Sequence, residues 1–237
     1  MRTDAALSLG LALVWLLLVW RVGPPTGDFA NYHVSASLWL EGQDLSRLYD
    51  YRWFGEQATR LGWADKPVGF PVLTPPTVLF ALPLVPLGLH GAALAWQLLQ
   101  GVMGLLLAFV LARGAGRPLW TALALMLAFW PSWRSHLEQG QFHLPAVLLV
   151  ALGYLLIVRG RTAGAGACWG LAAGMKLFAW PLLPLLLLGR QWRASAAFVG
   201  VLALGSLASF GLLGLDLNLR WVREIAPASA SGMFMDP

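Results

Sequence analysis

Three long uncharged stretches constrain the fold of this chain more than any other feature. No Asp, Glu, Lys or Arg occurs between Lys66 and Arg113, within 139–158 or within 194–215. An apolar helix of about 20 residues matches the ~30 Å hydrocarbon core of a bilayer. The chain is 58% hydrophobic and only 11% charged, whereas soluble domains carry roughly 25% charged residues. The sequence therefore predicts an all-α fold, a polytopic transmembrane helical bundle.

Arginines predict how this bundle is oriented. Three short connectors between the hydrophobic stretches hold arginines and no acidic residue: Arg113, Arg117, Arg159, Arg161, Arg190 and Arg193. Connectors of this kind are typical of the cytoplasmic side of a membrane protein. The net charge of +5 therefore reflects membrane orientation, and no nucleic-acid partner is expected. We predict a multi-pass protein of the plasma (inner) membrane, with 1–237 forming a single membrane domain.

We expect about seven spans in this domain. Five are hydrophobic stretches at about 5–22, 91–112, 118–131, 141–158 and 194–215. Lys176, Pro181 and Pro184 interrupt the stretch 162–189, which we interpret as two short helices of about 13 residues each. The proline-rich stretch 71–89 is predicted to dip into the membrane and return, because a full crossing would place Arg113 and Arg117 outside.

The polar segment 23–70 is predicted to be an extracytoplasmic loop, because its six acidic residues outnumber its four basic ones. Helical spacing from Phe29 to Leu40 predicts a helix that Gly42 ends, and 49–63 predicts a second, aromatic-rich helix. Both are expected to lie in the membrane interface. Asp28 is the first acidic residue beyond the first span. It either caps the helix that follows or acts as a reactive carboxylate near the membrane surface.

Three features are expected on the outer face: Asp28, the loop 134–143 and Lys176. A carboxylate there can take a proton from a hydroxyl, and cations can stabilise the charge that develops on a leaving phosphate. Lys176 costs ~2.5–3.5 kcal/mol in a hydrophobic run, so such a residue usually has a function. Arg134 is the second candidate for phosphate binding, and a close packing face is predicted from three glycines at four-residue spacing, Gly166, Gly170 and Gly174.

Other polar and aromatic residues are candidates for contact with a substrate. They are Tyr32, Tyr49, Glu138, Gln141 and His143. The two tyrosines either stack on a sugar or lipid, or anchor the loop in the interface. His136, Glu138 and His143 have a loose spacing for metal ligands, and the chain has no Asp-x-Asp pair. We therefore expect no cofactor, and a divalent metal is not favoured.

Four sequence blocks resemble the GT-C superfamily of membrane glycosyltransferases, and most closely the bacterial polyprenol-phosphate-mannose-dependent mannosyltransferases. The first block is Gly27-Asp28-Phe29 with Tyr32, followed by Gly42–Leu45 and Leu48–Asp50. The second runs from Phe70 to Pro76 and continues at Leu82–Leu84. The third is Gly140-Gln141 after Trp133-Arg134. The fourth is Gly170–Leu177, followed by Pro181 and the pair Arg190 and Arg193.

The resemblance implies that Asp28 is the catalytic base. It also implies a polyprenyl-phosphate hexose donor, with mannose as the sugar in keeping with the named subfamily, inversion at the anomeric carbon, and a lipid or glycan acceptor. Two features differ from that family. Thr74 stands where the family has a tyrosine before the Pro75-Pro76 pair. Family members are also longer, which predicts that this chain is a fragment, one half of a split enzyme with a second subunit, or a degenerate member.

Two other classes of function stay open. One is a non-catalytic or split-enzyme membrane subunit that binds polyprenyl lipid. The other is a small transporter with a relay of Lys176, Glu138 and Asp28, although the long uncharged runs hold no acidic residue to extend it. The expected partners are therefore membrane lipids, the lipid-linked sugar donor and its acceptor.

Overall fold

The computed structural model describes residues 2–63 and 74–230, and all regular elements in these ranges are helical. This confirms the all-α fold class. The chain divides into two compact units, one formed by Met1–Pro25 with Leu94–Ala203 and the other by Thr26–Ala93 with Leu204–Pro237. The expectation of one membrane domain stays a prediction. Each unit is described by itself.

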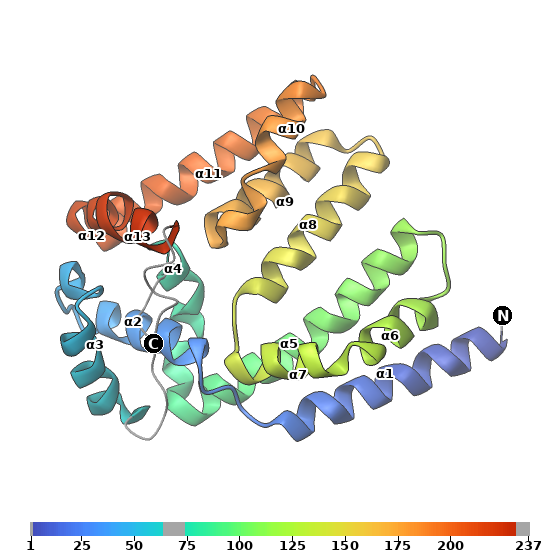
Figure 1. The fold of residues 1–237 in the computed structure, drawn as a ribbon, viewed down its shortest axis with the longest axis horizontal. Coiled ribbons are helices and arrows are strands. Elements are labelled where there is room, and N and C mark those ends of the chain that lie inside the picture. Colours follow the sequence, from blue (N-terminus) through green and yellow to red (C-terminus); the bar gives the residue numbers. More distant parts are fainter. Residues whose placement is uncertain (1, 64–73, 231–237) are drawn as a thin grey trace. The chain divides into compact units, whose positions relative to one another are not determined.

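The first unit is a group of helices (Figure 1). Its elements are α1 (Arg2–Val22), the part of α5 (Gly88–Gly114) from Leu94, α6 (Leu119–Ala128), α7 (Trp130–Gln139), α8 (His143–Val158), α9 (Thr162–Met175), η4 (Leu177–Ala179), α10 (Leu182–Leu188) and the part of α11 (Trp192–Leu213) up to Ala203. Helix α1 packs against α6 and α7, and α8 packs along α9. The core is formed by Trp15, Val19, Ala108, Leu123, Met126 and Leu137.

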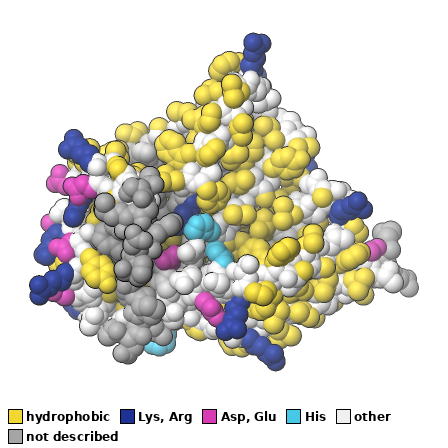
Figure 2. Space-filling model, viewed as in Figure 1, with side chains coloured by type: hydrophobic (Ala, Val, Ile, Leu, Met, Phe, Trp, Pro, Cys, Tyr) yellow, Lys and Arg dark blue, Asp and Glu magenta, His cyan; other side chains and the backbone are white. Residues whose placement is uncertain are grey.

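Helices of this length and composition can cross a bilayer. Within the described residues, three helical stretches are long and apolar enough: Thr3–Val22, Thr77–Gly114 and Trp192–Leu213. Three shorter apolar helices are Leu119–Ala128, His143–Val158 and Leu177–Leu188. Apolar side chains cover much of the visible surface (Figure 2). Helix α9 has 14 residues, close to the expected 13. Helix α10, with seven residues, is shorter than expected, because Leu177–Ala179 form the 3-10 helix η4 and α10 begins only after Pro181.

The second unit contains the helices of the expected outer loop. These are α2 (Asp28–Leu40), η1 (Leu45–Arg47), α3 (Tyr51–Ala58) and η2 (Thr59–Trp63). The unit also contains α4 (Thr77–Ala81), η3 (Leu82–Leu87), α12 (Leu215–Arg220), η5 (Trp221–Ile225) and α13 (Ala226–Ala230). Both predicted loop helices are confirmed. Gly42 adopts φ 69° just after α2, which suits a residue without a side chain at a helix end. The Asp50 carboxylate accepts a hydrogen bond from the Trp53 amide at 3.1 Å and caps α3.

The expected re-entrant stretch 71–89 falls partly outside the described residues, as do Phe70–Leu73 of the second sequence block. The described part folds into α4 and η3, and Gly88 with φ 66° ends η3. Five α-helical and six 3-10 residues span about 20 Å, which is less than the ~30 Å of a hydrocarbon core. The re-entrant course of 71–89 stays a prediction.

Two glycines of α9 allow a close approach to α11. A Cβ added to Gly166 would lie 1.9 Å from the Ala194 carbonyl oxygen, and one added to Gly170 would lie 2.4 Å from that of Phe198. Gly174 is less constrained, because its nearest neighbour would be the Leu202 side chain at 3.7 Å. The predicted packing face is therefore confirmed for Gly166 and Gly170, where backbone meets backbone.

The glycine contact gives a stability prediction. Gly166→Ala should lower the free energy of unfolding by roughly 1–3 kcal/mol, because the added methyl group has to push two backbones apart. Gly200→Ala, on α11, is the matched control, because an added Cβ there meets nothing within 4 Å. Thermal unfolding of the purified proteins in detergent compares them. Equal stability of Gly166→Ala and the parent would contradict the close contact.

The arginine-rich connectors give a topology prediction. In a Cys168→Ala background, cysteines at the exposed positions Ala115 and Gln191 should be shielded from a membrane-impermeant thiol reagent in intact cells. A cysteine replacing the exposed Glu56 should be labelled. Labelling at position 115 in intact cells would show instead that 71–89 crosses the membrane fully. Permeabilised cells provide the control that each cysteine can react.

Candidate active site

The turn between α7 and α8 brings two histidines together in the first unit. Gly140 ends α7 in the left-handed conformation with φ 67°, and α8 begins at His143. The Trp96 indole holds this turn against α5, because its Nε1 donates to the Gly140 carbonyl at 2.9 Å. As a result, the rings of His136 and His143 lie 6.3 Å apart.

Lys176 lies beside this histidine pair. Its backbone is extended, with φ −148° and ψ 134°, so α9 ends at Met175 and the 3-10 helix η4 follows. The Phe178 ring of η4 stacks on the His143 imidazole, with centroids 6.2 Å apart. Burial lowers the pKa of His136 to about 4, and the positive charge of Lys176 adds to this effect. The structure therefore brings Lys176 close to His136 and His143. The expected loop 134–143 is corrected, because its residues up to Gln139 belong to helix α7 and only Gly140–Phe142 form a turn.

A small pocket of about 230 Å³ opens at the histidine pair, with walls formed by Ser132, Trp133, His136, His143, Leu144 and Val147. His136 Nε2 and His143 Nδ1 are buried, and neither nitrogen has a hydrogen-bond partner in the part of the chain that the structure describes. A neutral imidazole carries one N–H donor, and Lys176 adds a cation nearby. This arrangement can bind an anionic oxygen, since hydrogen bonds to a charged acceptor are stronger than neutral ones.

Arg134 and Glu138 form an exposed ion pair on α7. Arg134 Nε lies 2.7 Å from Glu138 Oε1, and the side chains are 64% and 45% exposed. Exposed pairs of this kind contribute about 0–1 kcal/mol, so a phosphate could replace the carboxylate at little cost. Gln141 is half-buried in the same turn. Both charged candidates lie at the surface, whereas the histidine nitrogens are buried.

Asp28 occupies the first residue of α2 in the second unit, and Gly27 takes the N-cap position. The capping hypothesis is therefore wrong in its detail, because Asp28 lies inside the helix. A carboxylate in the first turn interacts favourably with the partial positive charge of the helix N-terminus, by about 0.3–1 kcal/mol. The Asp28 side chain is half-buried.

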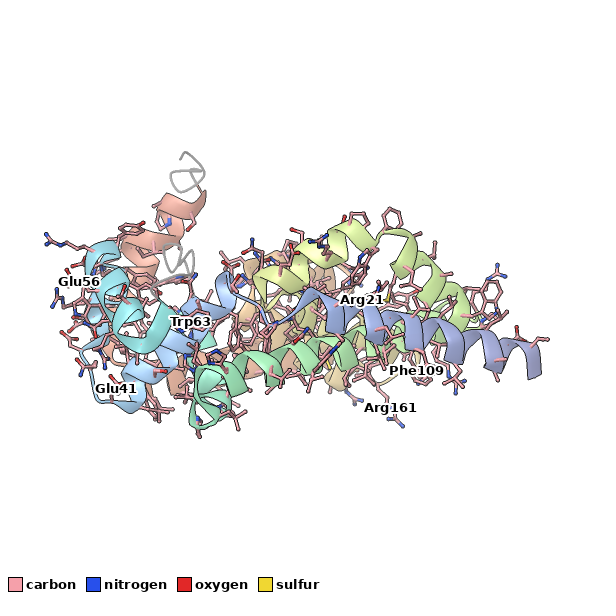
Figure 3. All side chains as sticks on the ribbon, turned by 90° about the horizontal axis from the view of Figure 1, so that it is seen from below. Arg21, Glu41, Glu56, Trp63, Phe109 and Arg161 are labelled. Carbon is pink, nitrogen blue, oxygen red and sulfur yellow. The ribbon has the colours of Figure 1, made fainter. Side chains whose placement is uncertain are left out.

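The two candidate tyrosines are core residues of the second unit. Tyr32 is 1% exposed and Tyr49 is 2% exposed, and burial raises the pKa of Tyr49 well above its usual value. Their burial favours a structural role over stacking on a sugar. Trp63, at the end of η2 (Figure 3), packs edge-on against Phe29 and His33 with centroids 6.3 and 6.0 Å apart.

Sequence reasoning missed two polar residues beside Asp28. Asn31 and Ser35 lie three and seven positions after it, which places all three on one face of α2. Asn31 Oδ1 and Ser35 Oγ are buried and have no hydrogen-bond partner among residues 2–63 and 74–230. The helical spacing could have identified them, but their burial depends on packing. Among the described residues, no group of three or more His, Cys, Asp and Glu side chains is placed to hold a metal ion. That no metal is needed stays a prediction.

Comparison with known proteins decides the family. The sequence model of glycosyltransferase family 87 matches residues 73–236, more than two thirds of the chain. The chain belongs to glycosyltransferase family 87. It is thus a membrane glycosyltransferase of the GT-C type, and the expected superfamily is confirmed. No curated protein and no solved structure matched the chain.

The family 87 match covers only part of the candidate site. Arg134, Glu138, Gln141, His143 and Lys176 lie within the matched residues, whereas Asp28, Tyr32 and Tyr49 precede them. The match therefore supports a glycosyltransferase, and the catalytic role of Asp28 stays a prediction.

The buried His136 gives a prediction about pH. Its pKa is about 4 in the folded chain and 6.5 in a model peptide. Between pH 6.5 and pH 4, the imidazole is therefore protonated in the unfolded chain and neutral in the folded chain. Stability should therefore fall as the pH is lowered from about 6.5 towards 4. His136→Gln should weaken this dependence, whereas His90→Gln, at an exposed position, should keep it. Thermal unfolding at pH 7 and pH 5 measures the difference. An unchanged pH dependence in His136→Gln would contradict the assignment.

Proposed function

We propose that this family 87 chain transfers a hexose, mannose by its resemblance, from a polyprenyl-phosphate donor to a hydroxyl of a lipid or glycan. The observation that carries the proposal is the position of Lys176. The chain breaks α9 there, and the lysine comes beside two imidazoles and a pocket at the ends of α7 and α8. A cation beside neutral N–H donors suits a leaving phosphate.

Asp28 acts as the base in the proposed reaction. Its carboxylate takes the proton of the acceptor hydroxyl while the hydroxyl oxygen forms a bond to the anomeric carbon. The bond from that carbon to the phosphate oxygen breaks at the same time, and polyprenyl phosphate leaves with the electron pair. Attack from the face opposite the leaving group inverts the anomeric carbon. Lys176 stabilises the phosphate charge, and Arg134 is a second cation for it.

The proposed location of this reaction is the extracytoplasmic face of the plasma membrane. The acidic loop helices and the arginine-rich connectors support opposite sides for the two regions. A non-catalytic subunit that binds polyprenyl lipid remains the second candidate, since the histidine pocket with Lys176 would serve binding alone. The two functions differ in their need for the Asp28 carboxylate.

Asp28→Asn tests this difference. Asparagine has nearly the same shape but cannot accept the proton, and loss of a general base typically slows a reaction roughly 10²–10⁴-fold. Stability should change by less than about 1 kcal/mol, the size of the helix-dipole interaction. Transfer of radiolabelled mannose from polyprenyl-phosphate mannose is measured in membranes that contain the chain.

Asp44→Asn provides the matched control in the same loop. Asp44 Oδ1 accepts a hydrogen bond from the Ser46 amide at 2.9 Å and caps η1, so its change should leave transfer intact. Near-normal transfer by Asp28→Asn would remove Asp28 as the base and make Glu138 the next candidate.

A further inference from the structure

An apolar groove runs along α5 and α6 in the first unit. It has a volume of about 750 Å³, and its walls include Leu111, Ala115, Thr121, Leu125, Phe129 and Trp133. The part between Thr121 and Phe129 follows about 12 Å of helix. Arg117 lines the groove where the cytoplasmic side is predicted, and none of the described residues that line the groove is acidic.

Trp133 lines both the groove and the histidine pocket. Its ring is fixed in place, because it packs edge-on against the buried Trp15 at 5.3 Å and against His136 at 6.2 Å. The groove and the histidine pocket therefore adjoin at this indole. The groove offers an apolar surface and the pocket offers imidazole donors beside a cation.

We propose that this groove and pocket together form the binding site for polyprenyl phosphate, with the isoprenoid chain along α5 and α6 and the phosphate at His136 and His143. This inference rests on the proposed donor and adds the place of its lipid chain. The occupant follows from charge and shape. The apolar groove adjoins a pocket with two buried histidine nitrogens, and Lys176 lies beside these histidines. This arrangement suits a single chain with an anionic end. A phosphomonoester presents its charged oxygens at the end of the chain, whereas the phosphodiester of most phospholipids carries a second substituent.

The histidines act as neutral donors in this site. Burial keeps the His136 pKa near 4, so its imidazole is uncharged at neutral pH and retains one N–H. Hydrogen bonds to charged groups contribute about 1.5–3 kcal/mol, which corresponds to roughly ten- to hundredfold in affinity. Lys176 then supplies the positive charge that attracts the phosphate, and the imidazole N–H groups orient it.

Binding of radiolabelled farnesyl phosphate to the full chain in phosphatidylcholine nanodiscs tests the groove. Leu125→Trp should reduce the affinity at least about tenfold, because the larger ring fills the groove. Leu125 is 63% exposed, so the change should not disturb the core. The control is Leu106→Trp on α5, which is 48% exposed and lines neither space. Equal affinity of Leu125→Trp and the parent would overturn the proposal.

Comparison of farnesyl phosphate with farnesol tests the pocket. His143→Leu should weaken binding of the phosphate about tenfold or more and leave farnesol unchanged, and His143→Gln should restore part of the loss because it keeps a neutral N–H. Equal effects on both ligands would overturn the phosphate assignment. Phosphatidic acid is the competitor, and displacement as effective as that by unlabelled farnesyl phosphate would show a general anionic-lipid site instead.

The result is separable from the proposed function. Asp28→Asn should leave farnesyl phosphate binding unchanged, since it removes only proton transfer. Binding that depends on Leu125 and His143 without any sugar transfer would leave this site standing and overturn the transferase proposal. Sugar transfer that Leu125→Trp does not affect would overturn this site alone.

Discussion

The first unit depends on the packing and hydrogen bonding of the Trp15 indole. The ring is fully buried, its Nε1 donates to the Gly101 carbonyl at 2.9 Å, and it packs edge-on against Trp130 and Trp133. Gly104 makes room for it, because a Cβ there would lie 2.3 Å from the ring. A buried indole N–H needs an acceptor, so this bond fixes α1 against α5. The same ring holds Trp133, the shared wall of the groove and the histidine pocket.

Close helix packing has a second consequence at α9. The contact of Gly166 and Gly170 with the α11 backbone fixes the helix from which Lys176 emerges. Small residues are how helices approach closely in a membrane, where apolar side chains gain nothing by leaving the lipid. A lysine at the end of such a helix has a defined position, and its charge reaches His136. The architecture therefore couples a packing motif to the cation that the proposed chemistry requires.

The two imidazoles bring buried polar atoms to the pocket. Buried polar atoms without partners are costly, by about 1–3 kcal/mol each, and proteins rarely keep them without a function. His136 Nε2, His143 Nδ1 and, in the second unit, Asn31 Oδ1 and Ser35 Oγ are all of this kind. In a member of glycosyltransferase family 87, such groups can bind substrate, because sugars and phosphates form many hydrogen bonds.

The sequence alone determined the long helices and the break near Lys176, but it missed α7, whose residues it assigned to a span end and a loop. Hydrophobic run length, prolines and the turn at Gly42 act within a few residues, so the bounds of α1, α2, α5 and α11 follow from local patterns. Only the tertiary structure decided which side chains meet. The stacking of Phe178 on His143 and the buried positions of Tyr32 and Tyr49 depend on how helices distant in sequence pack. Asp28 shows how precisely sequence patterns place a helix end. The helix α2 starts one residue earlier than expected, so Asp28 is a first-turn carboxylate and not the cap.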